Sequence, residues 1–158
     1  MDYPERDLNL HGKAWLAWGI GPQRGKPVLQ AVGKPLGEAR LALVTTGGLV
    51  PPGAEPFSTG KLGDPSFREI PVGIPPDELE IFHPHYDHAP ARRDINIVFP
   101  LPLARELVAE GEVGQLTDTH YSFMGYVPRT RRLEQIYAPQ VAARLRQEAA
   151  DAVLLAPA

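Results

Sequence analysis

The densest group of chemically capable side chains lies in residues 83–88, His-Pro-His-Tyr-Asp-His, which hold three of the chain's five histidines. Imidazoles at His83, His85 and His88 could converge on one divalent metal ion such as zinc, iron or manganese, and Asp87 could be a further ligand, orient a histidine or accept a proton. The same side chains could instead work as general acids and bases or anchor a substrate, with Tyr86 beside them. A structural alternative is that the imidazoles cap the loop through hydrogen bonds to backbone carbonyls.

Three other segments could contact a substrate. Residues 45–48, Thr-Thr-Gly-Gly, offer hydroxyls and unhindered backbone amides for an anion, although Gly-Gly after a strand is more often only a turn. Arg68 could clamp a carboxylate through two hydrogen bonds, or could pair on the surface with Glu69 or Asp64. His120 lies among aromatic residues, a pattern more typical of a partly buried packing segment. The candidate binding residues are therefore Thr45, Thr46, Gly47, Gly48, Arg68, Glu69, Tyr86 and His120.

The string His-x-His-x-Asp-His is also the signature of the metallo-β-lactamase-fold hydrolases, in which an apolar strand precedes it too. The rest of the chain departs from that family, because no Gly-Gly follows the motif and His120 is the only later histidine. The length of 158 residues is also small for an αββα sandwich. A metal-dependent hydrolase or lyase that uses the histidine cluster is therefore the alternative function.

Short apolar runs predict the elements that must position these side chains. Four runs bounded by turn residues, proline or charge predict strands: residues 39–44, 79–82, 95–99 and 152–156. Two stretches with a four-residue apolar spacing predict helices: residues 102–110 and 139–150. Proline-rich stretches predict two long connections: residues 50–56 and 71–76.

The alternation of strands and helices favours a single α/β, Rossmann-like domain with a mainly parallel sheet and long proline-rich loops. We assign this domain to residues 39–158 and expect the poorly defined residues 1–38 to pack on it. Ligands of such sheets bind beyond the carboxyl ends of the strands, which is where residues 45–48 are expected to lie.

Composition excludes several classes of function. The chain has no cysteine, so it can form no disulfide, thiolate zinc site, iron–sulfur cluster or thiol nucleophile. A net charge of -3 with interspersed signs offers no basic stripe for nucleic acid. We find no leader, no apolar run long enough to cross a membrane, and no nucleotide or flavin motif. We therefore expect a cytoplasmic protein that binds a small molecule and forms a homo-oligomer.

Several motifs in a fixed order resemble one known family, the selenoprotein B family of the glycine, betaine and D-proline reductases. The match runs from about residue 38 to the end of the chain. It rests on these segments: Val-Thr-Thr-Gly-Gly at 44–48, Gly-Asp-Pro-Ser-Phe-Arg-Glu-Ile-Pro at 63–71, His-Pro-His-Tyr-Asp at 83–87, Asp-Ile-Asn-Ile-Val-Phe-Pro at 94–100 and His-Tyr-Ser-Phe-Met-Gly at 120–125.

The resemblance implies reductive cleavage of a carbon–nitrogen bond, in which a selenolate or thiolate attacks the carbon next to a carboxylate. It also implies that a companion subunit or thioredoxin-like donor resets the nucleophile, and that the nucleophile lies in a loop just after the last strand, beyond residues 151–157. This chain has no cysteine and stops at Ala158, so the attacking atom is absent, and neither serine nor histidine can replace it.

Three explanations stay open: a chain cut short at a selenocysteine codon or otherwise, a divergent member with different chemistry, or a non-catalytic subunit. In the reductase hypothesis, Arg68 and the Thr-Thr-Gly-Gly turn hold a substrate carboxylate while the histidines manage protons at the amine. In the metal hypothesis, His83, His85 and His88 are ligands, assisted by Asp87 or His120. An enzyme acting on a small carboxylate- or amine-bearing substrate is favoured, with a companion subunit that supplies redox chemistry.

Overall fold

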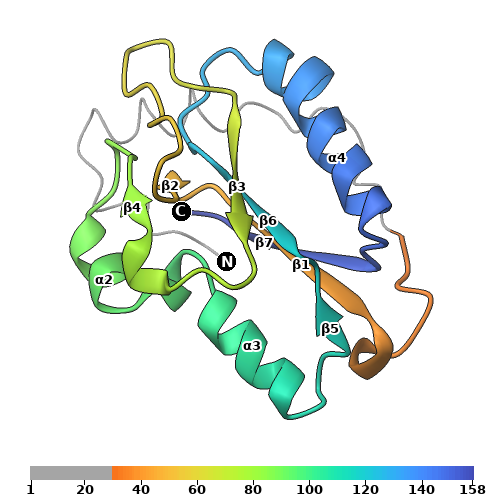
Figure 1. Cartoon of the computed structure of the whole chain (residues 1–158). Coiled ribbons are helices and arrows are strands. Elements are labelled where there is room, and N and C mark those ends of the chain that lie inside the picture. Colours follow the sequence, from red (N-terminus) through yellow and green to blue (C-terminus); the bar gives the residue numbers. More distant parts are fainter. Residues whose placement is uncertain (1–29) are drawn as a thin grey trace, which may run out of the picture. The chain divides into compact units, whose positions relative to one another are not determined.

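The computed structural model describes residues 30–158 of the chain, and a five-stranded sheet forms the centre of this part (Figure 1). Residues 32–158 form one unit, and the prediction for residues 1–38 falls mostly outside the described residues. The helices and strands of the described residues are β1 (Arg40–Thr45), β2 (Leu49–Val50), β3 (Phe67–Pro71), β4 (Glu80–Ile81), α2 (His88–Arg93), α3 (Leu101–Ala109), β5 (Gln115–Leu116), β6 (Thr119–Phe123), α4 (Ala138–Gln147) and β7 (Ala152–Ala156). The shorter helical segments are the 3-10 helices Leu36–Glu38, Pro76–Glu78 and Ile95–Ile97 and the π-helical turn Leu133–Tyr137.

Strand β1 is the central strand, and its three partners β5, β6 and β7 all run parallel to it. Leu41 pairs with both β5 and β7, and Thr45 pairs with both β6 and β7, so β7 lies on one side of β1 while β5 and β6 share the other. Strand β3 extends the sheet beyond β6 and is antiparallel to it. The predicted α/β fold with a mainly parallel sheet is confirmed, while its Rossmann-like character stays a prediction.

Both faces of β1 are covered, which explains its continuous apolar sequence. Leu43 packs into a core cluster that includes Ile70 and residues of α3, such as Leu101. The next side chain, Val44, points to the opposite face and packs near Tyr121 of β6 and Val141 of α4. Helices α3 and α4 therefore lie on opposite faces of the sheet (Figure 1).

Four of the six predicted strands and helices are confirmed within one residue at each end, and the helix predicted at residues 139–150 ends three residues earlier, at Gln147. The exception is residues 95–99, which we predicted as a strand and which instead begin with a 3-10 helix. The prediction was wrong because the Asp94 side chain accepts a hydrogen bond from the Asn96 amide and so caps a helical turn. Val98 and Phe99 remain buried, so the apolar run serves the core without forming a strand.

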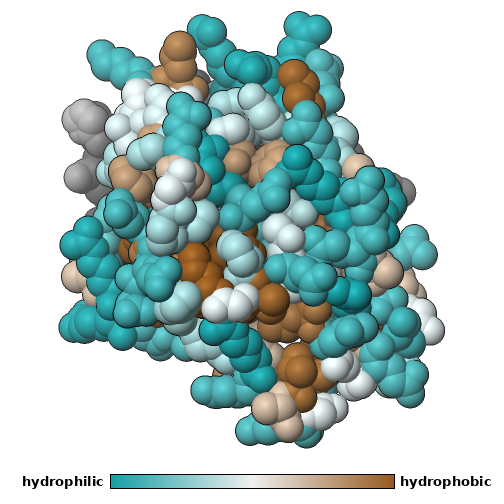
Figure 2. Space-filling model, viewed as in Figure 1, coloured by the Kyte–Doolittle hydropathy of each residue, from teal (hydrophilic) through white to brown (hydrophobic). Residues whose placement is uncertain are grey.

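The face of the molecule seen in Figure 2 is mainly hydrophilic, with apolar side chains gathered over β4, α2 and α3. A groove of about 420 Å³ lies there and contains no predicted site residue; its lining includes Leu79, Ile81, Ala91, Ile95 and Pro102.

Among the helices of residues 30–158, none is long and apolar enough to cross a membrane.

Candidate functional site

Strands β1, β6 and β7 end side by side, and the segments that follow them meet at this edge of the sheet. Gly47 forms an isolated β-bridge with Met124 after β6. The Thr46 amide donates to the Ala156 carbonyl at 3.1 Å, and the Ala158 amide donates to Thr46 Oγ1 at 3.0 Å. The predicted position of residues 45–48 at the carboxyl end of a parallel strand is therefore confirmed, and this edge is where α/β sheets bind ligands.

The amides of the Thr-Thr-Gly-Gly turn are engaged within the chain. The Gly47 amide donates to Thr45 Oγ1 at 2.9 Å, and the Gly48 amide donates to the Phe123 carbonyl at 2.9 Å. The Thr45 hydroxyl in turn donates to the Val98 carbonyl at 2.6 Å. This arrangement gives no support to the predicted anion site built from these amides. The hydrogen bonds instead fix the conformation of the turn at this edge of the sheet.

The loop after β4 brings His83 to the same edge. The Phe82 amide donates to the Gly48 carbonyl at 2.8 Å, which fixes the start of the loop against the turn. Gly48 has a φ of 67°, and a Cβ at this position would lie 2.8 Å from the Phe82 carbonyl oxygen. Only glycine accommodates both the backbone angle and this close approach.

His83 is only 6% exposed, and the two nitrogens of its ring differ in their partners. Nδ1 accepts a hydrogen bond from the His85 amide at 3.2 Å, so in the neutral ring Nε2 carries the proton. Nε2 is buried and has no hydrogen-bond partner among residues 30–158. Burial first, and then the nearby His85 and His88, lower the pKa of His83, which favours this neutral form.

Three polar atoms gather around Gly125 at this edge. A Cβ on Gly125 would lie 2.8 Å from His83 Nε2, 3.2 Å from the Thr46 carbonyl oxygen and 3.5 Å from the Ala158 carbonyl oxygen. The unpaired N–H donor of His83 thus lies beside two carbonyl acceptors. Nothing in the sequence distinguishes Gly125 from the other glycines, because its role depends on three segments far apart in the chain.

Aromatic rings hold the histidine loop in place. The Tyr86 hydroxyl donates to the Gly47 carbonyl at 3.0 Å, and its ring centroid lies 4.8 Å from those of both His83 and His88. Burial raises the pKa of Tyr86 to about 12. The His85 ring packs against Tyr126 at 4.4 Å, a contact that the sequence did not reveal. Tyr86 therefore positions the imidazole of His83 against the turn.

The geometry does not support the predicted metal site. His88 Nε2 donates to the His83 carbonyl at 2.5 Å, and the Asp87 side chain accepts from the Ala89 amide at 3.0 Å and caps α2. These groups are used locally, and nowhere in residues 30–158 do three His, Asp or Glu side chains gather closely enough to hold a metal ion. His88 instead makes the carbonyl hydrogen bond that the structural alternative describes.

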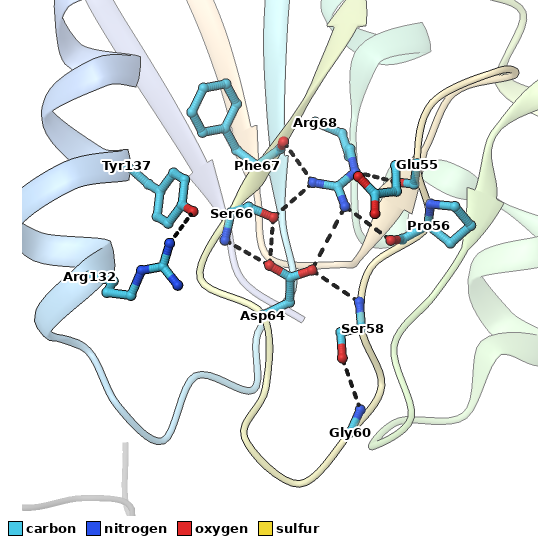
Figure 3. A network of polar contacts seen from close by, with 10 residues as sticks. All are labelled: Glu55, Pro56, Ser58, Gly60, Asp64, Ser66, Phe67, Arg68, Arg132 and Tyr137. Atoms are coloured by element: carbon cyan, nitrogen blue, oxygen red, sulfur yellow. Dashed lines mark hydrogen bonds and ion pairs between the residues drawn. The ribbon is translucent and has the colours of Figure 1, made fainter.

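Arg68 lies on β3, and Figure 3 shows its guanidinium surrounded by groups of its own chain. Its contacts tie the start of β3 to the preceding loop: the carbonyls of Glu55, Pro56 and Phe67, the Ser66 hydroxyl and, at 3.8 Å, the Asp64 carboxylate. The guanidinium also lies 4.2 Å from the centroid of the Phe57 ring. All three nitrogens of Arg68 are engaged, which favours a structural role over the predicted carboxylate clamp.

Asp64 completes this network. Its carboxylate accepts hydrogen bonds from the Ser66 amide at 2.9 Å and the Ser58 amide at 3.0 Å (Figure 3). Burial acts to raise the pKa of Asp64, but the hydrogen bonds from Ser66 and Ser58 and the charge of Arg68 outweigh it and lower the pKa. An ionised Asp64 therefore holds the loop together with Arg68.

The Arg68→Lys variant tests this structural role. We expect it to lower the free energy of unfolding by about 2 kcal/mol, because one ammonium cannot replace several hydrogen bonds from a guanidinium fork. Urea denaturation followed by circular dichroism measures the change. The control is Arg144→Lys, at the exposed ion pair with Glu69, for which we expect about 0–1 kcal/mol. Unchanged stability with loss of substrate binding in Arg68→Lys would restore the clamp hypothesis.

Two other candidates also have partners inside the chain. Glu69 forms an ion pair with Arg144 of α4. His120 is fully buried on β6, and its Nδ1 accepts a hydrogen bond from the Leu43 amide at 3.2 Å. The structure thus brings together the turn at 45–48 and residues 83–88, and leaves Arg68, Glu69 and His120 outside that group.

Comparison with known proteins identifies related sequences. Residues 24–158 match the family model described as glycine/sarcosine/betaine reductase selenoprotein B (GRDB). The chain is 33% identical over 129 residues to the D-proline reductase subunit gamma of Acetoanaerobium sticklandii, a match that covers 82% of this chain and 52% of that subunit. It is 34% identical over 126 residues to the glycine reductase complex component B subunit gamma of Carboxydothermus hydrogenoformans, covering 77% of this chain and 28% of that subunit.

The chain is also 26% identical over 141 residues to the betaine reductase complex component B subunit beta of Peptoclostridium acidaminophilum, covering 85% of this chain and 31% of that subunit. The chain therefore spans about half the length of one of these relatives and less than a third of the other two. No solved structure matches it significantly.

Proposed function

The chain belongs to the glycine/sarcosine/betaine reductase selenoprotein B family, and from this membership we propose that it provides the substrate-binding edge of a reductase that cleaves a carbon–nitrogen bond. The substrate would be a small molecule that carries both a carboxylate and an amine. The observation that carries the proposal is the buried, unpaired Nε2 of His83 at the edge where β1, β6 and β7 end.

The polar atoms at this edge suit the two ends of such a substrate. His83 Nε2–H can donate to a carboxylate oxygen, while the Thr46 carbonyl can accept a hydrogen bond from an ammonium group. Pro157 and Ala158 are exposed, so they can be displaced when a ligand reaches Nε2. In this proposal His83 takes over the carboxylate contact that we first gave to Arg68 and the Thr-Thr-Gly-Gly turn.

The chemistry requires a thiolate or selenolate that this cysteine-free chain does not contain. We propose that a companion polypeptide supplies it. Its attack forms a carbon–sulfur or carbon–selenium bond and breaks the carbon–nitrogen bond, and the ammonium leaves as a neutral amine with the bonding electron pair. A second thiol then attacks the sulfur or selenium, the electron pair returns to the carbon, which takes a proton from water, and a disulfide or selenenylsulfide remains.

A neutral His83 fits this scheme as a hydrogen-bond donor better than as an acid, because a neutral imidazole is a very weak acid. Its lowered pKa keeps it neutral near pH 7, and Nδ1 stays occupied by the His85 amide. Its role is then to hold the carboxylate so that the neighbouring carbon faces the incoming nucleophile.

Isothermal titration calorimetry with glycine, sarcosine, betaine and D-proline tests the proposal. We expect one of these to bind, and His83→Phe to weaken binding by about 10- to 100-fold, the cost of one hydrogen bond to a charged group. Gly125→Ala should weaken binding as well, because its Cβ would lie 2.8 Å from Nε2. The control is Gly73→Ala, where a Cβ would meet no atom within 4 Å.

The outcomes separate the three hypotheses. Failure of all four ligands to bind, or equal binding by His83→Phe, would contradict the proposal. One equivalent of bound metal that His83→Phe loses would favour the metal-dependent hydrolase or lyase. Binding without amine release, even when a thiol-bearing family subunit is added, would favour the non-catalytic module.

A further inference from the structure

The last strand of the sheet presents an apolar edge to solvent. Within residues 30–158, β7 pairs with β1 alone, which leaves its outer edge without a partner strand (Figure 1). Its three central side chains are largely exposed: Val153 at 41%, Leu154 at 44% and Leu155 at 68%. Their partners on β1 are covered, since Ala42 and Leu43 are fully buried.

The exposed side chains lie on both faces of the sheet. Paired positions on neighbouring strands point to the same face. Leu154 pairs with Leu43 and so lies on the α3 face, while Leu155 pairs with Val44 and lies on the α4 face. Both side chains stay exposed although each face carries a helix. A helix docked on one face could therefore bury only part of this surface, whereas an added strand with its own cover could bury all of it.

The opposite edge of the same sheet shows how an edge strand is normally protected. β3, which pairs with β6 alone among the described residues, reads Phe-Arg-Glu-Ile-Pro and carries two charges and a proline. Such residues are typical of edges that must not pair with other chains. β7 reads Ala-Val-Leu-Leu-Ala and has none of them, a composition typical of a strand buried inside a parallel sheet.

We propose that the outer edge of β7 is the docking surface for a companion polypeptide that carries family sequence absent from this chain. That polypeptide adds a strand beside β7 and covers Val153, Leu154 and Leu155 on both faces. The three relatives described above are named as reductase subunits, and between 48% and 72% of their length lies outside the match, which follows from matched shares of 52% and 28%. Such sequence could supply a strand that pairs with β7.

The position of β7 links this surface to the candidate site. The Ala156 carbonyl at its carboxyl end accepts a hydrogen bond from the Thr46 amide, and the Ala158 carbonyl and His83 Nε2 both lie close to Gly125. A strand paired with β7 would therefore have one of its ends next to the substrate-binding edge. A second copy of this chain could also pair along β7, but it has no cysteine and could not bring the nucleophile. Only the argument against a second copy of this chain rests on the proposed function.

Co-expression tests the docking surface. The full chain, with an affinity tag, is co-expressed with the part of the Acetoanaerobium sticklandii subunit outside its match, and separately with the corresponding part of the Carboxydothermus hydrogenoformans subunit. Sedimentation velocity measures the stoichiometry of the purified product. We expect a 1:1 complex with at least one of the two, formed without substrate, so this test can fail independently of the calorimetry.

Matched leucine variants locate the surface. Leu154→Lys and Leu155→Lys should reduce the co-purified partner at least tenfold, whereas Leu103→Lys on α3 should not, although Leu103 is 47% exposed and so matches Leu154. Urea denaturation of each variant alone checks that it folds. The proposal is overturned if neither partner co-purifies, if the β7 variants retain it, or if the chain alone is a dimer that Leu155→Lys converts to a monomer.

Discussion

Replacement of Gly63 with alanine is expected to lower the free energy of unfolding by about 3 kcal/mol or more, from backbone strain combined with overpacking. Gly63 has a φ of 66°, a conformation that alanine rarely adopts. A Cβ there would lie 2.2 Å from the Tyr126 carbonyl oxygen and 2.9 Å from Pro128 Cδ. Because a backbone carbonyl cannot rotate away like a flexible side chain, the whole segment after Gly125 must move.

Gly53→Ala separates the two causes. Gly53 has a similar φ of 77°, but a Cβ there would meet no atom within 4 Å. This control should therefore lose only the backbone strain, about 1 kcal/mol. Urea denaturation measures both variants. An equal loss in the free energy of unfolding for Gly63→Ala and Gly53→Ala would show that the loop around Gly63 moves freely and that Gly63 does not hold Tyr126.

The same substitution should disturb the candidate site, because Tyr126 packs against His85 at 4.4 Å. Two-dimensional NMR of the histidine ring protons should show shifts for His85 in Gly63→Ala and none in Gly53→Ala. The loop held by Arg68 and Asp64 would then be linked to the histidine loop through Tyr126, although neither charged residue contacts a histidine.

The longer strands that the sequence predicted are those that are themselves continuous apolar runs. β1 and β7 are recognisable because a continuous apolar run is typical of a strand in a parallel sheet. β3 was missed, since its charges make sense only through partners distant in sequence, such as Arg144 for Glu69. Residues 95–97 were wrongly predicted as part of a strand, because a short apolar run is compatible with either a strand or a 3-10 turn. The hydrogen bond that the Asp94 side chain accepts from the Asn96 amide favours the turn.

The sequence could predict which segments form the candidate site, but not how their atoms are arranged. The density of histidines drew attention to residues 83–88, and the end of β1 drew attention to residues 45–48; the structure places these two segments in contact. Which ring nitrogen of His83 is available depends on the hydrogen bond from the His85 amide and on the close approach of Gly125. The spacing of residues in the sequence reveals neither contact. Arg68 looked like a ligand clamp because its type fits that role, whereas its neighbours in space occupy all of its nitrogens.

His120→Ala is expected to destabilise the fold by about 3 kcal/mol, the sum of a cavity and a buried amide that loses its acceptor. β1 pairs with β5 at residues 40 and 41 and with β6 at residues 44 and 45, so the Leu43 amide falls between the two ladders. His120 Nδ1 accepts from that amide at 3.2 Å and fills the gap. His120→Gln, which can return an acceptor, should lose less than His120→Ala in urea denaturation.

Acid should remove the same stabilisation in the wild-type protein. Burial, opposed by Glu148 and aided by Arg105, lowers the pKa of His120 from 6.5 to about 4. Because the folded-state pKa lies below the unfolded value, the contribution is fully present above pH 6.5 and is lost as the pH falls toward 4. A shift of this size corresponds to about 3 kcal/mol.

The pH dependence distinguishes titration of His120 from the general effect of acid on the fold. Urea denaturation between pH 7 and pH 4 should show a steep fall in the free energy of unfolding for the wild-type protein. His120→Gln cannot bind this proton, so its curve should be flatter by up to about 1.4 kcal/mol per pH unit, the value for one proton. Parallel curves for the two proteins would mean that another group governs the acid sensitivity, and that His120 stabilises the sheet through its hydrogen bond alone.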